Sequence, residues 1–292
     1  MFNLISAEWL KLTRRPLVWV LLAVFLGLLA LQILTQFALV AIFGGRTPGP
    51  ALATQLDEWR RRSAFPGLFG VVFNHINGLG GIFAVVLAAA AMGSEYGWGT
   101  LRTQLARQPA RARLLLAKVV TLLALLAVAS LLALALGVAL GAALGALTGG
   151  AGRIAPGDLA RIPLALGRAL FVLLPYVLLT LCLTIAGRSL LVGLAGGLLY
   201  LVFEVGFGAL ALFRVLGGPW RQIYNLTIGQ NINTLALQNS HAFGLRPEQV
   251  APLDIAALPP PPQAALVIAV YCALLLATAT WWLRAHDVFG PS

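Results

Sequence analysis

The residues best suited to binding another molecule lie in one stretch between two long apolar runs, at positions 93–118. Glycines in this stretch permit sharp turns of the backbone, and Thr100 can cap a helix that starts at Leu101. That helix would expose Arg102 and Arg107. Arginine and aromatic side chains are the strongest anchors at protein interfaces, so the stretch predicts a docking surface for a partner protein. The alternative is an ordinary basic loop without a partner.

A second set of polar residues lies inside the apolar runs themselves. Glu204 is the one acid deep in such a run, and an ionisable side chain there is costly and is a functional candidate by default. It could line a substrate cavity or contact a partner subunit, or it could be a paired or protonated residue that fixes helix packing. Asn74, His75 and Asn77 form a polar patch in another run. A histidine among amides is more often a hydrogen-bonding residue than a metal ligand, and the remaining histidines are remote, so we predict no metal site.

The chain lacks the residues of a nucleotide-binding loop. Such a loop needs glycines followed by Lys and Ser or Thr, but the two lysines, Lys11 and Lys118, are followed by Leu and Val and follow no glycine loop. No cofactor is therefore expected in this chain. If ATP drives the protein, a separate polypeptide must bind it.

The composition indicates what kind of protein must hold these residues in place. Of the 292 residues, 60% are hydrophobic and 10% are charged, whereas soluble domains carry about 45–50% apolar and about 25% charged residues. A bilayer core about 30 Å thick requires about 20 apolar residues in a helix. We predict an all-α membrane protein whose single transmembrane domain, residues 17–292, has six spans at about 17–43, 67–92, 114–147, 164–186, 189–213 and 264–283. Lys118, near the start of the third span, is expected to extend to the lipid headgroups.

Residues 1–16 read as an amphipathic helix that lies in the membrane interface before the first span. Trp9 and leucines alternate there with Lys11, Arg14 and Arg15, which we expect to face anionic headgroups. A short basic flank that only orients the first span is the alternative. Basic residues are denser in the short segments on the side of the N-terminus, so we predict that both termini are cytoplasmic.

Two connections on the other side are also informative. In residues 51–65, three arginines stand beside acids, which favours a solvated or lipid-facing surface helix over nucleic-acid binding. Residues 214–263 form the longest connection. Its apolar content predicts short ordered helices, and long ordered loops are usually functional.

The docking stretch also resembles a known family in the residues Glu95, Gly99, Thr100, Arg107, Pro109, Arg111 and Lys118. These are similar to the signature of type-2 ATP-binding-cassette (ABC) transporter permeases, the exporter class that includes the bacitracin-resistance permeases. The resemblance implies that 94–113 is a coupling segment whose contacts with an ATPase involve Glu95, Tyr96, Gly99, Thr100, Arg102, Arg107, Pro109 and Arg111. It also implies an elbow helix at Leu4 to Arg15, and small re-entrant helices within 214–263.

The resemblance further implies the partners and the location. We expect two copies of an ABC ATPase that carry ATP and Mg, a second permease in a homodimer or heterodimer, and the cytoplasmic membrane as the site of action. By analogy with the family, the second and fifth spans flank the dimer axis and the export path, which the patch at Asn74 to Asn77 and Glu204 could face.

Small residues at intervals of four in the third span let helices approach closely in lipid. We interpret Gly137, Gly141, Gly145 and Gly149 as a packing stripe, against another span of this chain or at a subunit interface.

Three functions fit these features to different degrees. The first is an export permease for a lipophilic or amphipathic molecule, because the spans are almost uncharged. The second is a secondary transporter or channel driven by an ion gradient, which normally needs several ionisable residues mid-membrane. The third, a membrane-embedded enzyme, would need a cluster of catalytic groups that the sequence does not display.

Overall fold

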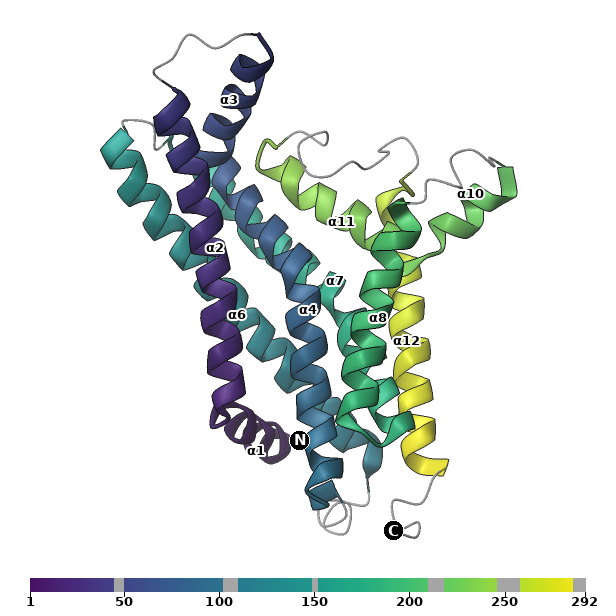
Figure 1. Ribbon diagram of the computed structural model, residues 1–292. Coiled ribbons are helices and arrows are strands. Elements are labelled where there is room, and N and C mark those ends of the chain that lie inside the picture. Colours follow the sequence, from purple (N-terminus) through teal and green to yellow (C-terminus); the bar gives the residue numbers. More distant parts are fainter. Residues whose placement is uncertain (45–49, 102–109, 149–151, 210–217, 246–257, 286–292) are drawn as a thin grey trace.

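The computed structural model describes residues 1–44, 50–101, 110–148, 152–209, 218–245 and 258–285. These residues fold into helices joined by short turns, and the described part contains no strand (Figure 1). The helices are α1 (Phe2–Thr13), α2 (Pro16–Phe43), α3 (Pro50–Ser63), α4 (Gly67–Gly97), α6 (Arg111–Thr148), α7 (Pro156–Gly187), α8 (Leu190–Ala209), α10 (Gly218–Asn225), α11 (Ile228–Ala242) and α12 (Pro261–Ala285).

Local sequence explains where several helices begin and end. Proline occupies the first position of α2 and α7, where its missing N–H costs no hydrogen bond. The carboxylate of Asp158 accepts a hydrogen bond from the backbone of Ala155 at 3.0 Å and so caps the start of α7. Between α7 and α8, Arg188 adopts the left-handed conformation at φ 49°. Arg188 thus forms the short turn that the predicted spans at 164–186 and 189–213 leave between them.

Among the described residues, five helices are long and apolar enough to cross a membrane: α2, α4, α6, α7 and α12. Helix α8 is a sixth apolar helix, with a shorter stretch from Leu190 to Gly206. The last part of the predicted fifth span, residues 210–213, lies outside the described residues. The structure therefore supports a multi-pass helical membrane protein, and the sixth span stays a prediction.

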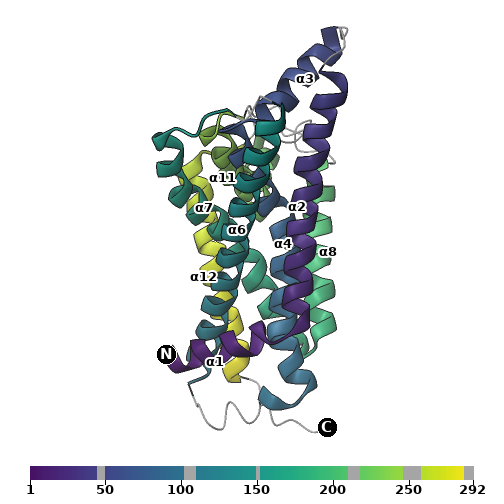
Figure 2. The same ribbon diagram turned by 90° about the vertical axis from the view of Figure 1, so that its left-hand side faces the viewer.

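The long helices form an elongated bundle around α4. This helix packs against α2, α6, α7, α8 and α11, and most of its side chains are buried. Helix α1 lies across one end of the bundle, the end at which α12 also finishes (Figure 2). We call this the terminal end. Helices α3, α10 and α11 lie at the opposite end.

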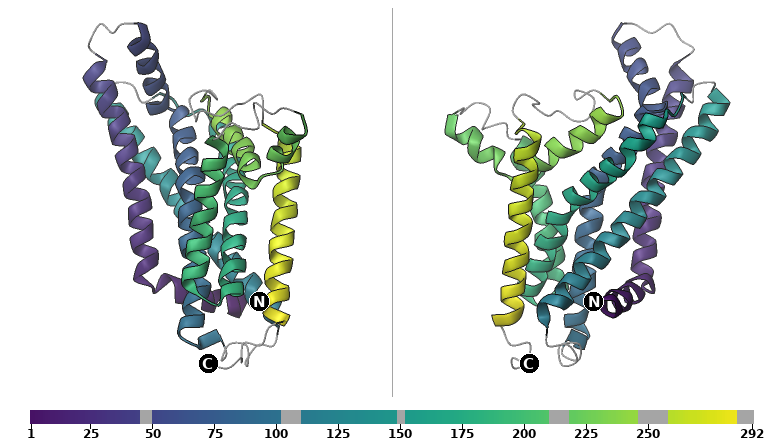
Figure 3. Two further views of the ribbon diagram at one scale, coloured as in Figure 1. Left: turned by 45° about the vertical axis from the view of Figure 1, so that its right-hand side comes forward. Right: turned by 180° about the vertical axis from the view of Figure 1, so that it is seen from behind.

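Helices α10 and α11 form a V at that opposite end, with the turn between them pointing toward the bundle (Figure 3). They occupy the segment in which the family resemblance implies re-entrant helices. Asn231 holds the turn, because its amide donates to the carbonyls of Asn225 and Thr227 at 2.8 and 2.7 Å. Helix α11 also packs on α4, α7 and α12, so it is an integral part of the bundle.

The glycines of α6 face α4 in the same chain. A Cβ atom at Gly137 would lie 2.6 Å from the side chain of Val72, and one at Gly141 would collide with the side chain of Leu68. Gly145 is buried, and Gly149 lies outside the described residues. At the first two positions the small residue is required for close contact between α6 and α4.

Candidate functional site

Four charged side chains meet at the terminal end of the bundle, where α1, α4 and α6 converge. The ammonium of Lys118 lies 2.7 Å from a carboxylate oxygen of Glu8 and 2.6 Å from one of Glu95. The ammonium of Lys11 lies 2.7 Å from the other oxygen of Glu8 and 3.4 Å from Glu95. We call these residues the charge cluster. Two acids and both lysines of the chain therefore join three helices that are far apart in sequence.

Three of the four members of the charge cluster are almost sealed from solvent, whereas the side chain of Lys11 is 38% exposed. The side chains of Lys118 and Glu95 are 1% and 2% exposed, and that of Glu8 is 4% exposed. Burial by itself would raise the pKa of Glu8, but the ammonium groups of Lys118 and Lys11 outweigh burial and leave this pKa below its ordinary value. The expectation that Lys118 extends to the headgroups is wrong, because two buried carboxylates hold its ammonium inside the bundle.

The end of the predicted elbow segment is tied to α4 by Arg15. Its guanidinium donates to the hydroxyl of Ser94 at 2.7 Å and to the carbonyl of Ala90 at 2.9 Å, and it stacks over the ring of Trp98 at 5.0 Å. The charged ends of Lys11 and Arg15 therefore bind protein groups, and their contact with anionic headgroups stays a prediction. Arg14 is exposed, and Trp9 is half-buried against the core.

The residues predicted to contact an ATPase are placed in three ways. Glu95 and Tyr96 belong to the last turn of α4. The side chain of Glu95 is buried, so it points into the protein and not to its surface. Gly99 has φ +66°, which makes the turn that follows α4, and Thr100 begins the next helical turn. Arg102, Arg107 and Pro109 lie outside the described residues.

Arg111 stands at the first position of α6 and reaches α12. Its guanidinium donates to the carbonyl of Leu283 and, at 3.3 Å, to that of Arg284. These carbonyls lie in the last turn of α12, where a cation is favourable because the helix dipole is negative there. The helices on both sides of residues 102–109 are thus anchored. The charge cluster holds α4, which precedes these residues, to α1 and α6. Arg111 holds α6, which follows them, to α12.

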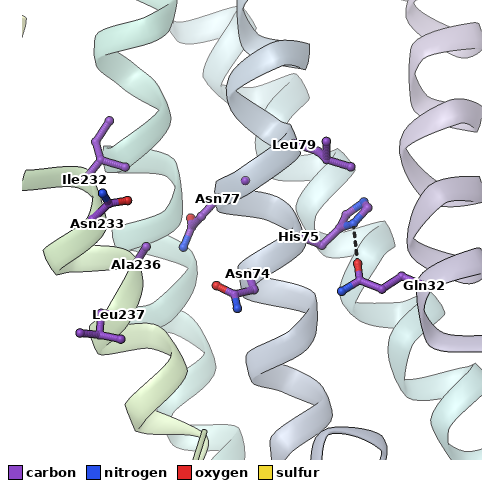
Figure 4. A pocket seen from close by; sticks show the side chains of 10 residues that line it. Gln32, Asn74, His75, Asn77, Leu79, Ile232, Asn233, Ala236 and Leu237 are labelled. Atoms are coloured by element: carbon purple, nitrogen blue, oxygen red, sulfur yellow. Dashed lines mark hydrogen bonds between the residues drawn. The ribbon is translucent and has the colours of Figure 1, made fainter. Parts of the chain in front are cut away.

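The second candidate site is a pocket of about 380 Å³ between α2, α4 and α11, in the half of the bundle away from the termini. Figure 4 shows Asn74 and Asn77 on the side of α4 toward α11, and His75 on the side toward Gln32 of α2. The lining residues are Gln32 of α2, Asn74, His75, Asn77, Gly78 and Leu79 of α4, and Ile232, Asn233, Ala236 and Leu237 of α11. The structure therefore brings the predicted polar patch together with two further amides, Gln32 and Asn233.

The side chains of His75 and Asn77 differ in whether they have hydrogen-bond partners. The ring nitrogens of His75 lie 3.1 Å from the amide oxygen of Gln32 and 3.0 Å from the carbonyl of Phe25, so both are engaged. Asn77 is 8% exposed, yet neither its amide nitrogen nor its amide oxygen has a hydrogen-bond partner among the described residues. Its side chain points into the space between α4 and α11 (Figure 4).

Glu204 lies apart from the lining of this pocket. It accepts hydrogen bonds from the hydroxyls of Tyr176 at 2.8 Å and Tyr200 at 3.0 Å, and from the backbone N–H of Gly229. A Cβ at Gly229 would lie 2.7 Å from the carboxyl carbon, so glycine is needed for this approach. At the other end of α11, Arg161 donates to the carbonyl of Ala242 at 2.9 Å. The carboxyl group of Glu204 at the first turn of α11 and the guanidinium of Arg161 at its last turn both bind backbone groups at the helix ends, so these contacts give Glu204 a role in anchoring that helix.

Sequence reasoning missed part of each site. It did not select Glu8, although this residue is the only acid before position 57 and lies three residues before one of two lysines. It did not select Asn233, which lies in a connection rich in Asn and Gln. Among the described residues, no group of three or more His, Cys, Asp or Glu side chains could hold a metal ion.

Comparison with known proteins decides the class of this chain. A family model described as ABC-2 family transporter protein matches residues 4–204, from α1 into α8. The chain belongs to the ABC-2 transporter family. Neither a curated protein nor a solved structure matches it.

Membership confirms the predicted kinship with type-2 ABC permeases and makes the chain a component of a membrane transporter. An ABC-2 protein is the transmembrane subunit of its transporter and not the ATPase, and membership implies an ABC ATPase as partner. The match contains the entire charge cluster and the α4 side of the pocket, and it ends before α11.

Proposed function

We propose that this ABC-2 protein is the permease subunit of an ATP-driven exporter for lipophilic or amphipathic molecules, with its ATPase on a separate chain. Two permeases, the same or related, and two ATPases would form the transporter, with six spans and both termini cytoplasmic. The nearly uncharged walls of the spans favour cargo of this kind over hydrophilic ions.

The charge cluster carries this proposal. It lies at the terminal end, directly before the connection at 102–109 where an ATPase would dock. Separating buried ion pairs is costly, so a push on this connection would move α1, α4 and α6 together rather than part them. Arg111 would pass the same movement to α12. In this arrangement Glu95 transmits force inside the bundle, whereas Arg102 and Arg107 make the docking contacts.

Reversing the charges of Arg102 and Arg107 to Glu should abolish binding of the ATPase. Like charges facing each other across an interface cost several kcal/mol, and about 1.4 kcal/mol already weakens binding tenfold. We expect co-purification of the ATPase with the tagged permease to fall at least about tenfold, with normal membrane insertion.

The matched control reverses Arg60 and Arg61, two exposed arginines of α3 at the opposite end of the bundle. This control should retain the ATPase. Undiminished capture by the first variant, or equal loss in both, would refute the proposed docking surface. Transport by the purified chain on an ion gradient alone would instead favour the secondary-transporter alternative.

A further inference from the structure

The pocket between α2, α4 and α11 contains a side chain that the protein leaves without a partner. Asn77 is more than nine-tenths buried, and both polar atoms of its amide lack a hydrogen-bond partner among the described residues. A buried amide group costs free energy unless it is paired, and native proteins rarely leave both its atoms unpaired. Its direction, toward the space between α4 and α11, indicates where a partner would sit (Figure 4).

The other polar groups of the pocket define what that partner must be. Asn74, Asn233 and Gln32 add three more amides, each able to donate and to accept. The described lining contains no Asp, Glu, Lys or Arg. His75 is engaged by Gln32 and by the backbone of Phe25, so it serves to hold α4 against α2. Such a surface pairs with an uncharged group that offers both donors and acceptors, and it would not repay the desolvation of an ion.

The volume of the pocket and its apolar lining residues further define the ligand. The volume, about 380 Å³, falls within the range of small-molecule sites, about 300–1,000 Å³. Leu79, Ile232 and Leu237 supply apolar walls beside the amides. A molecule that fits both kinds of surface has a neutral polar part and an apolar part.

We propose that this pocket binds the uncharged hydrogen-bonding part, carboxamide or hydroxyl, of an amphipathic molecule, and that the amide of Asn77 is its central contact. This proposal adds the chemistry of the cargo to the proposed function. Binding of the ligand does not depend on that function, and only the claim that the ligand is transported rests on it. Helix α11 supplies four of the ten lining residues, and Glu204 and Arg161 anchor both its ends, so the site is preorganised.

The test compares Asn77→Leu with wild type in nanodiscs, without an ATPase. The probe is radiolabelled n-octyl glucoside below its micelle concentration, with N-octylacetamide, octanoate and octylammonium as competitors. Wild type should bind the probe saturably, and only the neutral competitor should displace it. Asn77→Leu should bind about tenfold more weakly, because two hydrogen bonds are lost.

Stability without probe gives a second readout. Leucine has nearly the shape of asparagine and removes an unpaired amide, so Asn77→Leu should unfold at the same or a higher temperature. Asn239→Leu is the control, because the Asn239 amide donates to the carbonyl of Ala165 at 3.0 Å and lies outside the pocket. This control should lower stability and leave probe binding unchanged.

Three results would overturn the proposal: displacement by either ion, unchanged binding by Asn77→Leu, or lower stability of Asn77→Leu, which would reveal a structural partner for the amide. Loss of ATPase binding would bear on the proposed function and not on the pocket. A permease with Arg102 and Arg107 reversed should bind the probe as well as wild type, so each claim can fail without the other.

Discussion

Replacing Lys118 with Met should destabilise the protein by about 3–5 kcal/mol, the cost of removing one partner from a buried ion pair. The ammonium of Lys118 is held between Glu8 and Glu95, and its side chain is 1% exposed. Methionine preserves most of the volume but leaves two buried carboxylates with Lys11 as their sole ammonium in the charge cluster. The free energy of unfolding in mixed micelles measures the loss.

The pH dependence of Lys118→Met should have the opposite sign to that of wild type. The pKa of Glu8 is lowered in the folded protein, so its contribution to stability is present above its ordinary value of 4.5 and is lost as the pH falls below it. Lys118→Met removes the largest interaction that lowers this pKa, so we expect burial, opposed only by Lys11, to prevail and to raise the pKa of this carboxyl. Protonation then favours the folded state, so the variant should gain stability between about pH 7 and pH 5.

A second substitution provides the control for this experiment. Lys118→Met combined with Glu95→Gln restores the balance of one cation and one anion and should recover much of the lost stability. Equal stability of Lys118→Met and wild type, or the same pH slope in both, would show that the charge cluster does not hold the three helices together.

Replacing Gly93 with Ala should separate α4 from α8. The added Cβ would lie 2.5 Å from the Cβ of Leu190 and 3.0 Å from its backbone nitrogen, and a backbone cannot rotate away as a side chain can. Overpacking of this kind typically costs about 1–3 kcal/mol. We expect a loss of stability at the upper end of this range, again measured by unfolding in mixed micelles.

Gly97→Ala is the matched control, since it lies one turn later in α4 and a Cβ there meets nothing within 4 Å. Alanine favours the helix more than glycine does, so this variant should be neutral or slightly more stable. Equal effects of the two substitutions would contradict the close packing of α4 on the start of α8.

The sequence predicted those features of the fold that depend on neighbouring residues. Long uncharged runs mark apolar helices wherever they occur, and Arg188 beside Gly187 marks the α7–α8 turn. The charged and polar contacts depend instead on how each helix is rotated about its axis. Lys118 near a span end is equally compatible with headgroups and with the buried carboxylates that it binds, because Glu8 is 110 residues away.

The same reason limited the prediction of the pocket. Asn74 and Asn77 were selected because they interrupt an apolar run, but Asn233 lies in a connection where polar residues are ordinary. Only the packing of α11 on α4 brings it to the pocket. Glu204 stands out in the sequence because an ionisable side chain is energetically costly in an apolar run. Its partners Tyr176 and Gly229 come from two other helices, so the sequence could not identify them.

Docking of the ATPase requires that the connection after α4 face the compartment of the ATPase. The direct measurement labels Arg107→Cys with a membrane-impermeant maleimide, with Cys182 and Cys272 replaced by alanine. We predict labelling in inside-out vesicles only, protection when the ATPase is bound, and the reverse sidedness for Arg61→Cys of α3. Labelling of Arg107→Cys from the outside of intact cells would contradict the account.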